Sequence, residues 1–539
     1  MVMEAVEGII IDVVNRKKIK GELIIEDGKI REVGEKENVP QQYILPGFVD
    51  SHIHIESSML VPSEFARLAV QHGTVATVSD PHEIANVCGK EGIEFMINNG
   101  REVPLKFYFG APSCVPATPF ETAGASLSVQ DTIDLLSRED IHYLAEMMNW
   151  PGVLNDDPEV YAKIEAARNK NKPVDGHAPG LKGDQAVKYA SAGITTDHEC
   201  FTKQEALDKL NQGMKIALRE GSAAKNYNAL HELIAEHVGR VMFCSDDKHP
   251  DDLAVGHINQ LAARSQELGY DLFDILQASC VVPVKHYNLN VGLLQPGDPA
   301  DFIIVDQLQT MSVRQTWIEG SPVYQNGEVL FPKVKFNAIN NFEPYEVEPK
   351  DFVVVADKET YPVIQAYDGE LITGKTFANL PQSNGTIQPD LQQDILKIAV
   401  VNRYQKTKPA VGFITNFGLK TGAIASSVAH DSHNIIAVGT SDESLSDVIN
   451  LIMRHQGGIA ALNDHKQEIL PLPIGGIMTD KTGYEAAASY EKLNRMATEM
   501  GSRLKAPFML ISFMALLVIP SLKISDKGVF DGEKFEFIK

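Results

Sequence analysis

Residues 48–54 read FVDSHIH, a short run of β-prone residues that ends in His52-Ile53-His54. Successive side chains of a β-strand point to opposite faces, so imidazoles two residues apart face the same way and can bind one metal ion. The same sequence pattern occurs seven more times before residue 250: a short apolar run, a polar cluster at its end and then a helical stretch. Eight strand–helix units are typical of a (β/α)8 TIM-like barrel, whose active site lies at the carboxyl ends of its strands.

The other seven runs carry the remaining candidate residues at their ends. They are VATVSDPHE (to Glu83), LKFYFGAPS (to Ser113), HYLAEMMN (to Asn149), PVDGHAP (to Pro179), ITTDHE (to Glu199), MKIALREGS (to Ser222) and RVMFCSDD (to Asp247). We therefore expect four imidazoles and two carboxylates to converge on one barrel mouth. These are His52, His54, Glu146, His177, His198 and Asp246.

Imidazole and carboxylate ligands together suit Zn, Fe or Mn, and six of them are enough for two ions that share a bridging group. Two divalent ions that share one water lower its pKa until hydroxide is available near neutrality. Asp246 then stands where it can take the proton of this hydroxide and return it to a leaving group. This chemistry is hydrolysis at an electrophilic carbon, with cleavage of an amide, imine or amidine-like C–N bond.

Two β-rich pieces flank the barrel. Residues 1–45 and 291–335 share alternating apolar and polar positions with turn signals such as EDGK and QNG. We expect them to fold together as one small sheet domain, split in sequence by the barrel at 46–290. A third region, 345–539, has mixed α/β texture. The expected fold is thus α/β: a barrel, a discontinuous sheet domain and an additional C-terminal domain.

Composition excludes several classes of partner. Of 539 residues, 49 are Lys or Arg and 72 are Asp or Glu, so the formal charge of −23 repels nucleic acid and anionic lipid. The longest apolar run, FMLISFMALLVI at 508–519, is too short to span a bilayer and predicts a buried core element. Five scattered cysteines without a CxxC pair, and an amino terminus unlike a signal peptide, predict a cytoplasmic protein with reduced thiols.

LPGFVDSHIHIESS, GHAPG, TDHE and CSDD together resemble the metal-dependent amidohydrolase superfamily. VSDPHEIANV, LAEMMNWPGV, FCSDDKHPDDL and ASSVAHDSHNIIAVG are similar, more narrowly, to its adenine deaminases of the Ade type. The resemblance covers essentially the whole chain. It implies a binuclear centre, of Mn or Fe with Zn still open, that hydrolyses adenine to hypoxanthine and ammonia in purine salvage or catabolism.

The resemblance also implies roles for single residues. The four histidines named above and Asp246 are ligands, and Glu146 bridges the two ions. Many members of the superfamily bridge with a carbamylated lysine, but AEMMNW offers none, so Glu146 is the local candidate.

The DPHE motif at the end of the second run has two interpretations. In the functional one, which we favour, Asp80, His82 and Glu83 transfer protons beside the metals or form an accessory metal site, so that His82 and Glu83 join Asp246 as catalytic candidates. In the other, the motif only caps a helix.

Three further features leave the choice open. Glu199 directly follows His198, and alternation along a strand predicts that it points away from the mouth. Arg219 either binds substrate or pairs with Glu220. The AHDSHN motif, with His430, Asp431 and His433, either reaches over the mouth to substrate or stabilises its own domain, and we slightly favour the second.

The same residues bear on several alternative functions. A cyclic amidohydrolase that opens a lactam or imide ring could use the same binuclear site. A metal-free barrel in an assembly or regulatory protein would lack some of the six ligands, and all six are present. The zinc deaminases with H-x-E and P-C-x-x-C are excluded because the chain has no CxxC. We expect a homodimer or a higher homo-oligomer.

Overall fold

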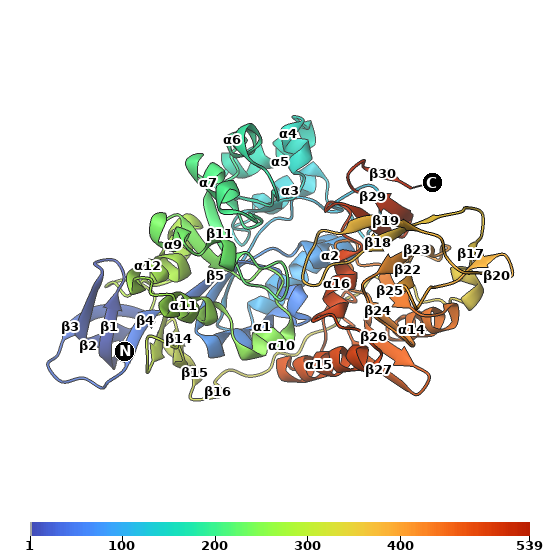
Figure 1. The fold of residues 1–539 in the computed structure, drawn as a ribbon. Helices are drawn as coiled ribbons and strands as arrows, with labels where there is room; N and C mark the ends of the chain where they lie inside the picture. The colour runs from blue at the N-terminus through green and yellow to red at the C-terminus, as the bar shows by residue number, and fades with distance from the viewer. Residues whose placement is uncertain (1–2, 539) are drawn as a thin grey trace.

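The computed structural model describes residues 3–538. A barrel occupies the middle of the molecule, with a small sheet at one end and the C-terminal domain at the other (Figure 1). Residues 1, 2 and 539, which belong to the expected first and last domains, lie outside the described residues. The expected α/β fold class is confirmed.

The barrel consists of eight short strands that pair in parallel wherever they form ladders. Each strand is shorter than its predicted run, because the polar cluster at the end of the run leaves the ladder and forms the mouth. The strands are β5 (Phe48–Ile53), β6 (Thr74–Ser79), β7 (Lys106–Phe109), β8 (Leu144–Met147), β9 (Val174–Gly176), β10 (Thr196–Asp197), β11 (Lys215–Arg219) and β12 (Val241–Cys244).

Single backbone contacts join the ladders into a ring. Between β7 and β8, the Ala145 amide donates to the Ala111 carbonyl over 2.9 Å. Between β9 and β10, the Thr195 amide donates to the Val174 carbonyl over 2.8 Å. The last strand returns to the first through the Asp246 amide, which donates to the His52 carbonyl over 2.9 Å. This final contact places two predicted ligands side by side.

Helices follow the strands and cover the outside of the barrel (Figure 1). Their boundaries follow local signals: α3 begins after a capping box at Ser128, and α5 after Asp157, whose side chain accepts from the Glu159 amide. The longer helices of this layer are α1 (Pro62–Ala69), α2 (His82–Gly100), α3 (Val129–Leu136), α5 (Pro158–Asn169), α6 (Gly183–Ser191), α7 (Lys203–Asn211), α10 (Pro250–Val255) and α11 (Ile258–Glu267).

The two β-rich pieces that flank the barrel lie in one eight-stranded sheet, where β4 pairs with β1 in parallel and with β13 in antiparallel. The stacked rings of Phe302 and Trp317, 5.2 Å apart, pack on one face of it. In sheet order the strands are β16 (Glu328–Val329), β15 (Ser321–Gln325), β14 (Val313–Ile318), β13 (Phe302–Val305), β4 (Tyr43–Pro46), β1 (Met3–Asp12), β2 (Lys17–Glu26) and β3 (Lys29–Glu35).

The C-terminal domain is built on a second eight-stranded sheet, covered on one face by α14 (Asp442–His455). Alternation along its central strand divides the core: Ala399 and Val401 face α14, whereas Ile398 and Val400 join the core shared with the barrel. In sheet order the strands are β19 (Gly374–Ala378), β18 (Tyr361–Gln365), β23 (Ala410–Thr415), β22 (Ile395–Val401), β25 (Ile435–Gly439), β24 (Ala423–Ser426), β26 (Gly458–Asn463) and β27 (Lys466–Pro471).

Two further helices, α15 (Gly483–Glu499) and α16 (Pro507–Phe513), lie between this sheet and the barrel (Figure 1). The apolar run at 508–519 starts within α16 and is buried along almost its whole length, in agreement with its predicted place in the core. Among residues 3–538, no helix combines the length and the apolar composition that crossing a membrane requires.

Candidate metal centre

The first group of predicted ligands meets where the ends of β5 and β12 lie side by side. His52 Nε2 and His54 Nε2 are 3.2 Å apart, because the two side chains leave the strand on the same face. Asp246 Oδ1 lies 3.5 Å from the first nitrogen and 3.1 Å from the second. Two ring nitrogens and one carboxylate oxygen thus surround a common point.

Glu146, on β8, lies between this group and a second one. Its Oε1 is 3.3 Å from His54 Nε2, whereas its Oε2 is 2.8 Å from His177 Nδ1 and 3.2 Å from His198 Nε2. One carboxylate oxygen therefore faces each group of imidazoles. This is the position that a bridging ligand between two ions requires.

The chemistry of the buried atoms fits divalent metal ions. His198 Nε2, one of the nitrogens that face the centre, is buried and makes no hydrogen bond among the described residues, an arrangement that is costly in a folded protein unless a ligand satisfies it. Several groups of three or four His, Asp and Glu residues each hold ligand atoms within 4.8 Å of one another. Neutral imidazoles and carboxylates in such groups suit Mn, Fe and Zn.

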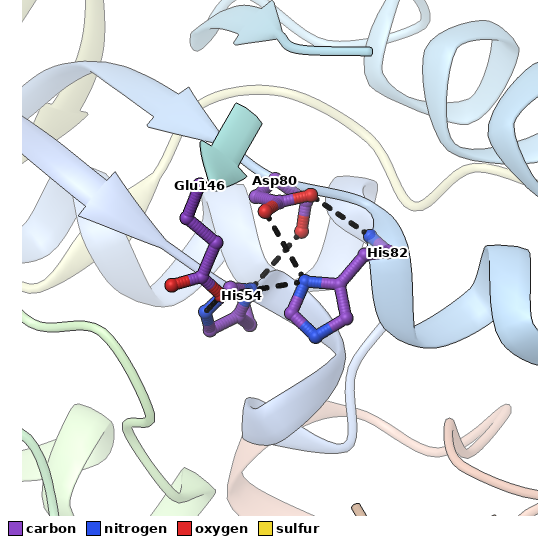
Figure 2. Close-up of side chains that lie close together, drawn as sticks. All are labelled: His54, Asp80, His82 and Glu146. Carbon is purple, nitrogen blue, oxygen red and sulfur yellow. Dashed lines mark hydrogen bonds and ion pairs between the residues drawn. The ribbon is translucent and has the colours of Figure 1, made fainter. Parts of the chain in front are cut away.

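The DPHE motif lies against the same carboxylate (Figure 2). His82 Nδ1 is 3.1 Å from Asp80 Oδ2 and 3.5 Å from Glu146 Oε1. His54 Nδ1 lies 3.2 Å from the Asp80 backbone carbonyl, and a proton donated there leaves Nε2 of the same ring with a free lone pair. Asp80 also accepts from the His82 amide, the first of α2, whereas the Ile84 amide in the first turn of that helix donates to Glu56.

Arg219, at the end of β11, is buried and joins two carboxylates. Its guanidinium donates to Glu199 and to Asp246 Oδ2. Of the two alternatives for Arg219, the ion pair with Glu220 is wrong, since Glu220 pairs with Lys225 and Arg264 at 3.2 Å each. Arg219 lines the cavity at the metal centre, but it is held by protein carboxylates.

Glu199 does not point away from the mouth, as alternation predicted. Its Oε1 lies 3.7 Å from both His177 Nδ1 and His198 Nε2. The reason is the length of β10, which ends at Asp197: His198 and Glu199 lie in a loop, where strand alternation no longer applies.

The AHDSHN motif reaches across to the barrel. The imidazoles of His430 and His433 both contact the carboxylate of Glu83, and Asp431 Oδ1 lies 3.9 Å from His82 Nε2. The slightly favoured interpretation, that this cluster serves only its own domain, is therefore wrong. No local sequence pattern predicts the contact of this motif with Glu83, because the contact depends on how two domains dock.

Charge and burial set the ionisation of the central carboxylates. Burial by itself raises the pKa of Glu146, but the imidazoles of His177, His198 and His54 outweigh it and hold that pKa well below its usual range. For Asp246, burial is likewise outweighed, chiefly by the Arg219 guanidinium, and the pKa lies well below its usual range. Both groups are anionic near neutrality, as metal ligands must be.

A cavity of about 30 Å³ at this centre is lined on one side by the ligands and on the other by the C-terminal domain. On the second side, His430 and Asp431 are joined by four apolar side chains, which sequence analysis missed because nothing distinguishes these four residues from ordinary core. They are Leu371, Phe513, Leu516 and Val518.

Comparison with known proteins identifies the class of protein to which this chain belongs. Residues 43–323 match the amidohydrolase family, so fold, ligand set and sequence define the same class of barrel hydrolase. Among solved structures, a beta-aspartyl dipeptidase from Fervidobacterium islandicum AW-1 is 16% identical with a TM-score of 0.47, covering 62% of this chain and 99% of that chain.

Matches to the C-terminal domain and to full-length relatives identify the family within this class. Residues 370–536 match the adenine deaminase C-terminal domain. The chain is 53% identical over 516 residues to an adenine deaminase of Salinibacter ruber, covering 95% of this chain and 94% of the relative. It is 50% identical over 549 residues to an adenine deaminase of Methanosarcina mazei, covering 99% of each. The chain therefore belongs to the adenine deaminases of the amidohydrolase family, and the resemblance read from its motifs is confirmed.

Proposed function

We propose that this chain hydrolyses adenine, with water, to hypoxanthine and ammonia. The observation that carries the proposal is similarity at about half of all positions to adenine deaminases over nearly the full length of both chains, C-terminal domain included. No comparison favours the alternative of a ring-opening lactam or imide hydrolase.

His52, His54, Glu146, His177, His198 and Asp246 would hold two divalent ions, with Mn or Fe the first candidates and Zn the next. When bound, such a pair supplies a water of strongly lowered pKa and a Lewis acid beside the purine. Glu146 would be the shared ligand, since each of its oxygens faces one group of imidazoles.

The protein's own groups move the protons. Water adds at C6 of adenine, and the bond from C6 to the amino nitrogen breaks. One proton of the water must reach that nitrogen for ammonia to leave, and the other ends on N1 of hypoxanthine. Asp246 is the first candidate to accept the proton, because Oδ1 faces the ligand nitrogens while Arg219 holds Oδ2. Glu83, with His82 beside it, is the second proton-transfer group, 3.6 Å from His82 Nε2.

Arg219 keeps Asp246 in one orientation, since it also binds Glu199 and the Ala224 carbonyl. Histidines 430 and 433 hold Glu83 in the same way from the C-terminal domain. The reacting carboxylates are therefore each fixed by partners that do not themselves need to touch the substrate.

The wider setting follows from this chemistry and from composition. Conversion of adenine to hypoxanthine serves purine salvage or catabolism. Five free cysteine thiols are typical of a protein in the reducing cytoplasm. We further propose a homodimer or higher homo-oligomer that takes a small-molecule substrate and binds neither nucleic acid nor membrane.

The test is a turnover assay on purified chain reconstituted separately with Mn, Fe and Zn. We expect equal amounts of ammonia and hypoxanthine from adenine, and no reaction with cyclic imides or lactams. Ring opening without ammonia release from adenine would refute the proposal, and the ranking of the three metals identifies the preferred ion.

A further inference from the structure

A second, larger cavity of about 520 Å³ lies beside the metal centre, between barrel loops and the C-terminal domain. Loops after β11 and β12 line it on the barrel side, and segment 368–372 with α15 and α16 lines it on the other. Its volume is within the usual range for sites that bind small molecules. None of the metal-ligand or proton-transfer groups lines it.

Two residues separate this cavity from the metal centre. Leu371 and Phe513 line both cavities, and both side chains are buried. Their backbone carbonyls are held together by Lys523, whose Nζ donates to Leu371 over 2.6 Å and to Phe513 over 2.9 Å. We call Leu371 and Phe513 the partition.

The large cavity also reaches the surface, since the exposed residues Lys225, Asp368 and Glu370 belong to its lining. The cavity thus extends from solvent to the partition. At about 30 Å³, the space on the metal side has room for about two water molecules, far less than a purine needs. A purine must therefore displace side chains to enter the metal-centre cavity. The partition is the wall between that cavity and the large cavity, which already has room for a purine.

Two residues of the lining, His249 and Asp251, carry polar atoms that are buried away from the cavity. His249 Nδ1 and Asp251 Oδ1 are buried without a hydrogen-bond partner among the described residues, and His249 is only 5% exposed. Burial lowers the pKa of His249 to about 4, so its imidazole is neutral at pH 7. His249 therefore adds a neutral imidazole, not a charge, to the lining of the cavity.

The remaining lining favours a flat, neutral molecule. Acidic side chains outnumber basic ones, so phosphate groups are repelled. Aromatic rings offer stacking faces. The acidic residues are Asp251, Asp252, Asp368 and Glu370; the basic ones are Lys225 and Lys505; and the rings are those of Phe201, Tyr490 and Phe513.

We propose that this cavity is a vestibule that binds the neutral purine base and passes it through the partition to the metal centre. The proposal rests on the proposed function for the identity of the base. It adds a second binding site for substrate and product, outside the catalytic centre.

Filling the vestibule tests the route. Ala506 lines the large cavity but not the metal-centre cavity, so Ala506→Trp obstructs only the former. We expect kcat/KM for adenine to fall about tenfold or more while kcat changes less than about threefold and the metal content stays the same. The matched control is Ala488→Trp, on the exposed face of α15, which should behave like wild type. Ile372→Trp, a partly exposed position in the same lining, repeats the test if Ala506→Trp does not fold.

A binding measurement separates the vestibule from catalysis. Equilibrium dialysis of hypoxanthine against the metal-loaded enzyme should show about two molecules per chain for wild type and about one for Ala506→Trp. One molecule per chain in both, or kinetics of Ala506→Trp equal to those of Ala488→Trp, would overturn the proposal. Failure of wild type to release ammonia from adenine would instead overturn the proposed function, and the dialysis result would still decide whether the second site exists.

Discussion

The metal centre has two walls of opposite character. The barrel wall presents imidazoles and carboxylates from five strand ends, all buried and most of them within 4 Å of a second ligand. The C-terminal wall presents apolar side chains from Leu371 and the segment 513–518, with His430 and Asp431 beside them. The first wall carries the groups that we propose take part in the reaction. The second encloses them and holds Glu83, a barrel residue, from outside.

This difference indicates a division of labour. Strand ends of a barrel fix ligand positions to within fractions of an ångström, which metal chemistry requires. Enclosure by a separate domain removes water and leaves a contact surface that can open for substrate. Variants on the barrel wall should therefore abolish chemistry, and variants on the C-terminal wall should weaken it.

The largest effect is expected on the barrel wall at Asp246. Asp246→Asn keeps an oxygen that can face the metals but cannot accept a proton, so kcat should fall by about 10²–10⁴-fold. Metal content measured by elemental analysis should remain near that of wild type. Asp306→Asn, an exposed change in the small sheet domain, is the control. A residual rate within about tenfold of wild type would remove Asp246 from the general-base role.

Glu146 should govern metal content rather than proton transfer. A neutral amide bridges two cations poorly, so Glu146→Gln should lower the bound metal from about two ions per chain toward one, with a parallel loss of activity. Because the bridge is part of the chain, metal-free wild type should regain full activity with Mn or Fe in bicarbonate-free buffer. The control is Glu165→Gln, exposed on α5. A bicarbonate requirement, or a Gln variant that keeps both ions, would show that another group bridges.

On the C-terminal wall, His433→Gln should have a smaller effect. Loss of a hydrogen bond to a charged group is worth about 1.5–3 kcal/mol, so kcat should fall about ten- to a hundredfold with unchanged metal content. His455→Gln, exposed at the end of α14 in the same domain, is the matched control. If His433→Gln equals that control, docking of the AHDSHN motif does not matter for the reaction.

The smallest effect concerns Lys523, which holds the partition. Burial lowers its pKa to about 7, whereas an unfolded lysine titrates near 10.4. Between these values the unfolded chain binds a proton that the folded chain does not, so this lysine makes the protein more stable as pH rises, by at most about 1.4 kcal/mol per pH unit. Below pH 7 both states are protonated and the contribution is flat.

Lys523→Met should remove that dependence. Melting temperatures measured from pH 6 to 9 should show a wild-type gain above pH 7 that the variant lacks, with a difference of a few degrees. Lys534→Met, at an exposed position near the C-terminus, should follow wild type. Parallel curves for Lys523→Met and wild type would mean that Lys523 titrates normally and is not held apart from water.

The sequence predicted the structure best where a feature depends on residues close together in the chain. The pair His52 and His54 follows from alternation along one strand, and the order of eight strand–helix units follows from apolar periodicity. Alternation failed at Glu199 because β10 is only two residues long and its end is a loop. The partner of Arg219 was missed for a related reason: its carboxylates come from neighbouring strand ends, not from the next residue in the chain.

By itself, the sequence determined the α/β fold class, the residue types of the candidate metal centre and the family, since repeating apolar runs, imidazoles and family motifs are properties of the linear chain. Only the tertiary structure decided that His430 and His433 hold Glu83, that Leu371 and Phe513 separate two cavities, and that Lys523 holds their carbonyls. The contacts of His430 and His433 with Glu83 cross a domain interface, and those of Lys523 join separate segments of the C-terminal domain. Their geometry depends on how whole domains pack, and packing leaves no periodic trace in the residues that it brings together.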